Sequence, residues 1–433
     1  MSPALVGALG VGLMLLMIFM GVWVGTAMLV AGFVGFIYLE GFPRAFTVLG
    51  TEPYSQIASY VLACVPLYIF MGITVSLTGI AGDLYKTANK WIGSVKGGLA
   101  IATTMACGAF SAICGSSDAS AAAMGKVAYP EMTKFGYDQK LASACIAAGG
   151  TIGILIPPSL GFILYGLLTE QSIGKLYMAG FIPGILEVIF YSITIHLLCR
   201  IKPALGPSAP KTLLREKIYS LKGVWAMLIL FLFVIGGIYA GVFTPTEAGA
   251  LGAFGALAIS FISRRLTRSK FAQSIKDTTQ ITAMIVLLIT GAFIFMRFLA
   301  VSRLPAMLSE FVIALQVSKF VILICIILFY IIIGCFWDIY AAMILTLPLI
   351  FPVIQISGFD PIWFGVIMVR CMEIGQITPP FGLNVFVLSS SSNVPVKTIF
   401  GGVWPFVISD LVHLTLLVLV PQISLFLPNM MRH

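Results

Sequence analysis

Two apolar stretches decide the fold of this chain, Gly149-Gly-Thr-Ile-Gly-Ile-Leu-Ile-Pro-Pro158 and Glu373-Ile-Gly-Gln-Ile-Thr-Pro-Pro-Phe-Gly-Leu-Asn384. Each contains a proline pair, with a glycine four residues before the first proline. Proline lacks the backbone N–H that a helix needs, and glycine permits the unusual backbone angles of a turn. We therefore expect two long helices, 140–167 and 362–390, each broken at its proline pair.

The composition places these stretches in a membrane. Of the 433 residues, 60% are hydrophobic and only 9% are charged, and the mean hydropathy is +1.07. A soluble globular chain is about 45–50% apolar, with about a quarter of its residues charged. These values exclude a soluble enzyme, a disordered protein and a nucleic-acid-binding protein, and the length accommodates about a dozen membrane-crossing elements. The sequence therefore predicts an all-α polytopic membrane protein.

Hydropathy divides the chain into about ten transmembrane helices and two re-entrant hairpins. Besides the two broken helices, we expect ordinary spans at 4–20, 23–39, 57–80, 176–199, 224–242, 248–263, 278–300 and 402–427. The first hairpin, 98–130, is interrupted at Gly115-Ser116-Ser117, and its arms are too short or too rich in small residues to cross comfortably. The second hairpin, 318–354, is interrupted around Gly334 and Asp338.

The net charge of +9 indicates topology rather than an anionic partner. Lysine and arginine gather in two short segments, first Arg200, Lys202, Lys211, Arg215, Lys217 and Lys222, and then Arg264, Arg265, Arg268, Lys270 and Lys276. Short basic loops stay in the cytoplasm, so we favour orientation signals over recognition of lipid headgroups and expect no nucleic-acid partner. Counting spans from the first basic loop predicts both termini outside the cytoplasm and hairpins that open to opposite sides.

The order of hairpin, broken helix and ordinary span occurs twice, in 98–200 and in 318–433. Asp118 precedes the first proline pair by nearly the same interval as Asp338 precedes the second. Matching interruptions in two halves of opposite orientation are typical of inverted-repeat secondary transporters, whose sites lie near the midplane where helices are broken. The sequence therefore predicts an inverted repeat and a transport site at the breaks.

A helix interrupted in the membrane exposes N–H groups at one new end and C=O groups at the other. Carbonyls and nearby hydroxyls suit Na⁺, while positive helix N-termini suit an anionic substrate. Thr378 is positioned to cap a helix that restarts at the second proline pair, and Ser116 and Ser117 are positioned to cap the second arm of the first hairpin. Such kinks and caps are also common structural features of membrane helices.

We expect the substrate to contact residues beside the breaks, namely Ser116, Ser117, Asp118, Ser120, Thr151, Pro157, Asp338, Arg370, Glu373 and Asn384. Glu373 is a functional candidate because ionisable residues deep in a span are costly. Arg370, one turn earlier, either pairs with Glu373, which we favour, or contacts the substrate. Asp118 and Asp338 have the simpler alternative of interacting with backbone N–H groups at a helix start.

Other ionisable residues in apolar segments are expected to have structural roles. Glu187 and His413 show no ligand spacing and are interpreted as packing or interface residues, and Arg297 is expected to reach the membrane interface. No HExxH or GxSxG motif and no paired catalytic histidine and aspartate occurs in the sequence. The sequence therefore predicts neither an enzyme nor an organic cofactor.

The sequence resembles the large membrane subunit of tripartite ATP-independent periplasmic (TRAP) transporters, the DctM-like family. The resemblance rests on the two proline-pair stretches together with Ile113-Cys-Gly-Ser-Ser-Asp-Ala-Ser-Ala-Ala-Ala-Met-Gly125, Gly334…Asp338, Pro348…Pro352 and Gly358-Phe-Asp-Pro-Ile-Trp-Phe-Gly-Val366. These motifs occur in order over nearly the whole chain. One departure is that many members have valine at the position of Asp118, and Asp or Thr at that of Ser120, which leaves the role of Asp118 open.

The resemblance implies an elevator-type transporter in the bacterial inner membrane, in which a transport domain slides against a scaffold. Segments 1–97 and 201–317 would form the scaffold, with both termini of the chain periplasmic. Such subunits import small organic acids with a Na⁺ gradient, using two or more Na⁺ ions. A periplasmic binding protein delivers the solute, and a small four-helix membrane subunit, a separate chain, packs on the scaffold. A carboxylate, a keto acid, a sialic acid and a sulfonate all remain open as the solute.

The resemblance also implies one Na⁺ site at each hairpin tip. One site would use Ser116 and Ser117, with carbonyls either near Gly334–Asp338 or in the Gly149–Gly153 bend. The other would use Asp338, Gly375 and Thr378. Which hairpin faces which broken helix stays open at the level of sequence. The alternative function is a Na⁺-coupled anion symporter of the dicarboxylate type that needs no binding protein.

Overall fold

The computed structural model describes residues 1–210 and 212–431, so Lys211 of the first basic segment lies outside the described residues. The described chain is helical, and no β-strand occurs among those residues. The first half contains α1 (Pro3–Phe19), α2 (Val24–Glu40), α3 (Phe42–Ile57), α4 (Cys64–Leu77), α5 (Ile80–Ile92), α6 (Gly98–Cys114), α7 (Ser117–Lys134), α8 (Gln139–Leu155), α9 (Leu160–Thr169) and α10 (Ile173–Ile201). The predicted all-α fold is confirmed.

The second half follows a connection made of three short helical pieces, η1 (Pro203–Leu205), α11 (Leu214–Ser220) and η2 (Leu221–Gly223). It contains α12 (Trp225–Tyr239), α13 (Pro245–Ile262), α14 (Arg268–Ser302), α15 (Leu304–Ala314), α16 (Lys319–Phe336), α17 (Ile339–Ile356), α18 (Pro361–Ile377), α19 (Leu383–Ser392), α20 (Val396–Leu419) and α21 (Gln422–Met430). The sequence did not predict α3 or α15, which lie between expected spans.

The second half repeats the helices of the first half at a nearly constant interval along the chain. Helix α7 covers 117–134 and α17 covers 339–356, while α8 covers 139–155 and α18 covers 361–377. The corresponding pairs begin with α1 and α12 in the two halves and end with α10 and α20. Its one exception is α14, which contains no proline and takes the place of both α3 and α4. The repeat is therefore longer than the predicted copies, and its inverted orientation stays a prediction.

Helix contacts follow the same repeat. Helix α2 packs on α14, and its counterpart α13 packs on α4. In the same way α7 packs on α19, and its counterpart α17 packs on α9. The arms α6 and α7 pack on α8, as α16 and α17 pack on α18. Each hairpin therefore contacts the first part of its own broken helix and the second part of the other one.

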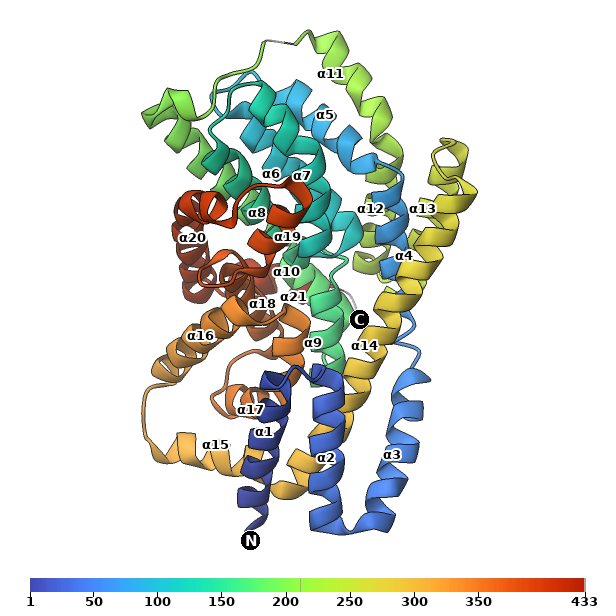
Figure 1. Cartoon of the computed structure of the whole chain (residues 1–433), viewed down its shortest axis with the longest axis vertical. Helices are drawn as coiled ribbons and strands as arrows, with labels where there is room; N and C mark the ends of the chain where they lie inside the picture. The colour runs from blue at the N-terminus through green and yellow to red at the C-terminus, as the bar shows by residue number, and fades with distance from the viewer. Residues whose placement is uncertain (211, 432–433) are drawn as a thin grey trace.

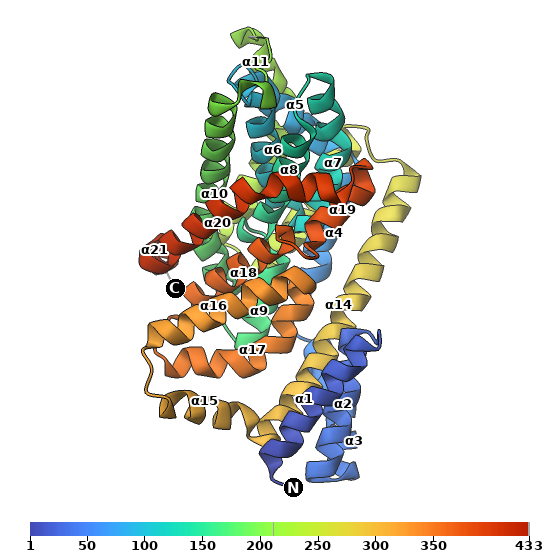
Figure 2. The same cartoon turned by 60° about the vertical axis from the view of Figure 1, so that its left-hand side comes forward.

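The helices form two groups, which are visible in Figures 1 and 2. In the first group α1, α2 and α3 lie along the lower half of α14, and α4 packs on α14 as well. Helix α13 packs on α4, and α12 packs on α13. The second group contains the two hairpins and broken helices with α10 and α20. Helices α5 and α15 connect the groups, because each follows a helix of the first group and precedes a hairpin. The predicted division into scaffold and transport segments, and any relative motion between them, stays a prediction.

Ion pairs tie the outer helices of the first group to their neighbours. Arg297 of α14 donates from Nε to Oε1 of Glu52 in α3 at 2.6 Å. Arg265, in the turn before α14, pairs with Asp83 of α5. The sequence predicted that Arg297 reaches the membrane interface, but it did not predict this ion pair with Glu52.

Six helices of the described chain, α10, α13, α14, α16, α17 and α20, are long and apolar enough to cross a membrane, and the count reaches nine when each of three bent helix pairs is one span. The bends are 67° between α4 and α5, 40° between α8 and α9, and 62° before α12. The predicted spans 4–20 and 23–39 correspond to α1 and α2, which are apolar but shorter, at 17 residues each. The bend between α8 and α9 lies at the first proline pair, as predicted.

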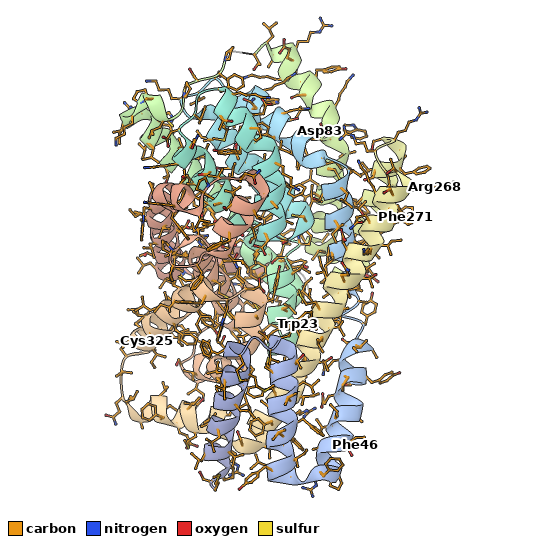
Figure 3. The ribbon with its side chains drawn as sticks, viewed as in Figure 1. Trp23, Phe46, Asp83, Arg268, Phe271 and Cys325 are labelled. Atoms are coloured by element: carbon orange, nitrogen blue, oxygen red, sulfur yellow. The ribbon has the colours of Figure 1, made fainter. Side chains whose placement is uncertain are left out.

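Large apolar side chains cover much of the outer surface. On α16 the exposed residues Phe320, Ile324, Leu328 and Ile332 are spaced by four and therefore share one face of the helix. Figure 3 shows Cys325 of α16 and Phe46 of α3 projecting outward. A contiguous exposed apolar surface of this kind is typical of helices that face lipid or another membrane subunit.

Candidate functional site

The tip of the first hairpin lies between α6 and α7. Gly115 has a φ of 63°, in the left-handed region where glycine is favoured, and the chain reverses there. Ser116 Oγ accepts the N–H of Ala119 at 3.4 Å, so the predicted helix cap is confirmed. Ser120 Oγ donates to the carbonyl of Ser116 at 2.9 Å and lies 2.8 Å from Ser111 Oγ. The hydroxyl of Ser120 is thus engaged within the hairpin.

The first hairpin meets the broken helix of its own repeat. A Cβ at Gly150 would lie 3.1 Å from the carbonyl oxygen of Ser117, and a Cβ at Gly153 would lie 3.2 Å from the carbonyl carbon of Ser116. The two glycines therefore let the hairpin tip approach α8 at backbone distance. Of the two alternatives for Ser116 and Ser117, the structure brings them to the Gly149–Gly153 segment. This segment is helical and the interruption follows Leu155, which corrects the predicted bend.

Two other predicted residues of this break have different neighbours. Gly149 faces α6, where a Cβ would lie 3.0 Å from Sγ of Cys107. Pro157 is buried in the interruption. The helix restarts after Ser159, whose hydroxyl accepts the N–H of Phe162 at 3.3 Å. A serine cap of the expected type thus occurs at this break.

The tip of the second hairpin lies between α16 and α17. Asp338 Oδ2 accepts the N–H groups of Tyr340 at 3.0 Å and Ala341 at 3.4 Å. A Cβ at Gly375 would lie 2.4 Å from the carbonyl carbon of Gly334, so this hairpin also meets its own broken helix. The backbone interaction anticipated for Asp338 is confirmed.

Asp338 is the counterpart of Ser116 and not of Asp118. Both Ser116 and Asp338 are N-caps of a second hairpin arm, each directly before the first residue of its helix, α7 or α17. The pairing of Asp118 with Asp338 in the sequence is therefore displaced by two positions, because a serine supplies the cap of the first hairpin. The counterpart of Asp118 is Tyr340.

The second break differs from the first in its cap. Thr378 Oγ1 donates back to the carbonyl of Ile374 at 2.6 Å and does not cap the following helix, which corrects the prediction. Helix α19 begins only at Leu383, after Gly382 with a φ of 57°. The N–H of Gly382 donates to the carbonyl of Cys335 at 3.2 Å, so this break is bonded directly to the second hairpin.

A cavity of about 520 Å³ lies between the two hairpin tips and the helices α4 and α14. The hairpin wall includes Ser116, Asp118, Asp338 and Tyr340. The opposite wall includes Gly72 and Ser76 of α4 with Asp277, Gln280 and Met284 of α14. Both repeats and both helix groups therefore meet at this open space.

Two polar groups at the first hairpin tip have no hydrogen-bond partner among the described residues. They are the buried Ser117 Oγ and the buried Asp118 Oδ1. A buried oxygen without a partner costs free energy unless a ligand, an ion or water satisfies it. Hydroxyl, carboxylate and carbonyl oxygens are the ligands that hard cations prefer. Within the described chain no three or more His, Cys, Asp and Glu side chains gather in a metal-binding arrangement.

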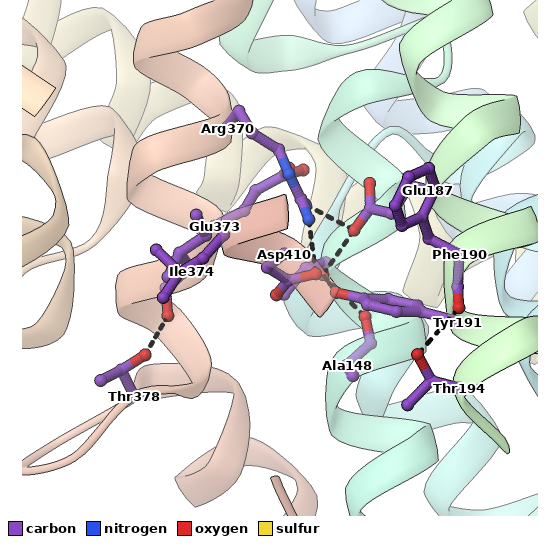
Figure 4. Close-up of polar contacts among 12 residues, drawn as sticks. Ala148, Glu187, Phe190, Tyr191, Thr194, Arg370, Glu373, Ile374, Thr378 and Asp410 are labelled. Atoms are coloured by element: carbon purple, nitrogen blue, oxygen red, sulfur yellow. Dashed lines mark hydrogen bonds and ion pairs between the residues drawn. The ribbon is translucent and has the colours of Figure 1, made fainter. Parts of the chain in front are cut away.

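Arg370 lies in a buried ionic network between the repeats, shown in Figure 4. It donates from Nη1 to Glu187 Oε1 at 2.6 Å and to Glu373 Oε2 at 3.1 Å, and from Nη2 to Asp410 Oδ1 at 2.5 Å. The predicted pairing with Glu373 is confirmed, and two further carboxylates join it from α10 and α20. The side chain of Arg370 is fully buried.

Thr151 and Asn384 lie in the interior of the second helix group and do not line the cavity. Thr151 Oγ1 is 3.2 Å from Glu187 Oε1 and 3.3 Å from the hydroxyl of Tyr191. Asn384 Nδ2 donates to the carbonyl of Ala147 at 3.5 Å, which links α19 to α8. The structure thus divides the predicted substrate residues between the cavity and this interior.

Sequence reasoning missed several residues of both sites. Asp410 could have been found by the argument used for Glu373, because it is also an acid within an apolar helix. Glu187 was interpreted only as a packing or interface residue. Asp277, Gln280 and Tyr340 line the cavity without any local motif. They reach it only because α14 and α17 pack together.

The family described as "Tripartite ATP-independent periplasmic transporter, DctM component" matches residues 11–423. The C4-dicarboxylate TRAP transporter large permease protein DctM of Pseudomonas aeruginosa is 35% identical over 89% of this chain and 90% of its own length. The isethionate TRAP transporter permease protein DctMQ of Oleidesulfovibrio alaskensis is 33% identical over 86% of this chain, which spans 59% of that relative.

A solved structure supports the fold. The YdaH transporter of Alcanivorax borkumensis has a TM-score of 0.63 to this chain, with 16% identity, over 90% of this chain and 88% of the other. The relatives that match at higher identity are TRAP permeases, which favours the TRAP function over the symporter that needs no binding protein. The chain belongs to the family of TRAP transporter large permease subunits, and it is a multi-pass membrane protein.

Proposed function

We propose that this permease carries a small organic anion across the bacterial inner membrane, driven by Na⁺ and supplied by a periplasmic binding protein. The observation that carries the proposal is the cavity between the hairpin tips and α4 and α14. Broken helices in an internal repeat commonly supply the binding sites of secondary transporters. The chain acts as a transporter and not as an enzyme.

The hairpin tips provide the groups that would hold Na⁺. Ser116 and Ser117 lie against α8, Asp118 lines the cavity beside them, and the partnerless oxygens of Ser117 and Asp118 support a cation at this hairpin tip. The second site would use Asp338, with the α18 segment that contains Gly375 and Thr378. Two or more Na⁺ ions would neutralise the acidic wall before an anion enters.

The relatives suggest the class of solute. They are named for C4-dicarboxylates and for isethionate, which are carboxylate and sulfonate anions respectively. Helix α7 begins beside the cavity, and the N-terminal end of a helix favours a negative group. A solute with one or two anionic groups is therefore the expected cargo.

The partners follow from the same family. The isethionate relative is named DctMQ, and this chain matches only 59% of it. This supports a second membrane component that works with the large subunit, for which we expect the small four-helix subunit of the family. The apolar outer surface provides room for that subunit and for lipid. Both termini of the chain would lie in the periplasm.

The division into two helix groups supports an elevator mechanism. The cavity wall from the hairpins belongs to one group, and the wall from α4 and α14 belongs to the other. Sliding of the hairpin group along α4 and α14 would carry a bound anion from one side of the membrane to the other. Helices α5 and α15 would follow this movement as connectors.

The experiment is uptake into proteoliposomes that contain the chain and the small subunit. Thermal stabilisation of the cognate binding protein first identifies the solute from a panel with succinate, pyruvate, N-acetylneuraminate and isethionate. We expect uptake of that labelled solute only when its binding protein is present. Equal uptake without the binding protein would support the symporter alternative and contradict the proposal.

A further inference from the structure

A series of polar contacts links α8 and α18, the helices that precede the two breaks. Thr151, two residues before Gly153, shares its hydroxyl proton between the carbonyl of Ala148 at 2.6 Å and Oε1 of Glu187 at 3.2 Å. The same oxygen accepts Nη1 of Arg370 at 2.6 Å. Arg370 Nη1 also donates to Oε2 of Glu373 at 3.1 Å, and Glu373 lies two residues before Gly375.

The two ends of this series are counterparts in the repeat. Thr151 and Glu373 are separated by the same interval along the chain that separates Gly153 from Gly375. Each of these glycines touches the backbone of its own hairpin tip. The series therefore ends at equivalent positions, each two residues from the glycine that lies against a hairpin tip.

Burial makes this network sensitive to small movements. Arg370, Glu187 and Glu373 are fully buried, and Thr151 is 1% exposed. In such an interior, charge-assisted bonds are stronger than in water, and a lost bond is not replaced by solvent. The guanidinium of Arg370 is rigid and planar. If it moves with one carboxylate, its hydrogen-bond distances and angles to the other carboxylates must change.

Asp410, on α20, also binds the guanidinium of Arg370. Its Oδ1 accepts Nη2 of Arg370 at 2.5 Å from α20, while Glu187 approaches from α10. Figure 4 shows these carboxylates converging on Arg370. With Arg370 anchored in this way, a displacement of α8 at Thr151 would reach α18, the helix of both Arg370 and Glu373, through Glu187.

We propose that this network, made of Thr151, Glu187, Arg370, Glu373 and Asp410, couples the two Na⁺ sites, so that a cation at one hairpin tip raises the affinity for a cation at the other. The inference rests on the proposed Na⁺ coupling. A cation bound between the first hairpin tip and α8 would shift the end of α8 beside Gly153, and Thr151 would pass this shift to Glu187. Linkage requires the effect to be reciprocal between the sites.

The test is equilibrium binding of ²²Na⁺ to the chain with its small subunit in lipid nanodiscs. We expect the wild type to bind two ions with a Hill coefficient of about 2, the limit for two coupled sites. Thr151→Val removes the hydroxyl at nearly unchanged volume. It should bind the same number of ions with a Hill coefficient of about 1 and a several-fold higher half-saturation concentration.

Thr194→Val is the matched control. Thr194 is also on a helix of the network, α10, but its Oγ1 only donates to the carbonyl of Phe190 at 2.9 Å. It should keep the wild-type Hill coefficient. Glu373→Gln tests the other end of the network and should also lower the Hill coefficient, which keeps the proposal falsifiable when Thr151→Val fails to fold.

The outcomes separate two failures. Wild-type cooperativity in both Thr151→Val and Glu373→Gln would overturn the coupling while leaving the sodium-driven function intact. Two ions bound independently by the wild type would overturn it as well. Absence of Na⁺ binding by the wild type would contradict the proposed function itself.

Discussion

Ser116 and Asp338 show how one residue serves both the fold and the cavity. Each caps the second arm of a hairpin, and each lines the cavity between the helix groups. Because the side chain is held by backbone N–H groups, its free oxygen lone pairs have a defined direction. The same short polar side chain thus ends the turn and offers an oxygen to a ligand.

We predict that Ser116→Ala raises the Na⁺ concentration for half-maximal uptake by about tenfold, the effect of losing roughly 1.4 kcal/mol of ion contact. The variant also loses an N-cap, worth about 1 kcal/mol of stability. Ser172→Ala is the control, because Ser172 caps α10 by accepting the N–H of Lys175 at 3.4 Å. Equal shifts in Na⁺ dependence for both variants would mean that Ser116 is only a cap.

Glycine at the broken helices sets the distance between each hairpin and its break. Gly375 lets α18 touch the backbone of α16, with space for no additional carbon atom. Gly236 of α12 is a helical glycine with nothing within 4 Å of the position of a Cβ. The two positions therefore differ in their surroundings and not in residue type.

We predict that Gly375→Ala reduces uptake at least about tenfold, because a displacement of the hairpin tip would cost more than about 1.4 kcal/mol. Gly236→Ala should leave uptake unchanged and should stabilise the helix by up to about 1 kcal/mol. Uptake assays and thermal melting of both purified variants provide the measurement. Normal uptake by Gly375→Ala would show that close contact at this break is not required.

The ionic network holds helices of the second group together. We predict that Arg370→Gln lowers stability by about 3–5 kcal/mol, because three buried carboxylates lose their cation. Arg297→Gln, which breaks the pair with Glu52, should cost no more than about 1 kcal/mol. Thermal melting of the two variants compares them directly, and equal melting temperatures would contradict the importance of the network.

The breaks and hairpins could be predicted from the sequence, but their partners could not. Proline pairs, a glycine four residues earlier and capping serines act locally, so they are readable without tertiary structure. Asp410 and Glu187 meet Arg370 only after α10, α18 and α20 have packed together. The cap at Thr378 was predicted incorrectly because Gly382 delays the start of α19.

At the scale of the whole molecule, the repeat extends beyond the transport elements that the sequence identified. The helices before each hairpin correspond as well, although their sequences carry no proline pair to mark them. Hydropathy alone shows that these helices exist, but it does not show which helix of one half corresponds to which helix of the other. The structure aligns them because α2 on α14 and α13 on α4 are equivalent contacts.

A tether across the cavity tests whether the two helix groups move. We predict that a cleavable bismaleimide linking Gln280→Cys of α14 to Tyr340→Cys of α17 stops uptake, in a background that lacks Cys114 and Cys325. Reduction of the linker should restore uptake, which controls for the substitutions themselves. Full uptake by the cross-linked complex would exclude sliding of the hairpin group along α14.

In the proposed transport cycle, a Na⁺ gradient drives an anion through this cavity. The most direct measurement is the initial rate of solute uptake into proteoliposomes with the small subunit and the binding protein, at a clamped membrane potential. We expect a high initial rate with an inward Na⁺ gradient and no uptake when K⁺ replaces Na⁺ on both sides. Equal rates in Na⁺ and K⁺ would contradict it.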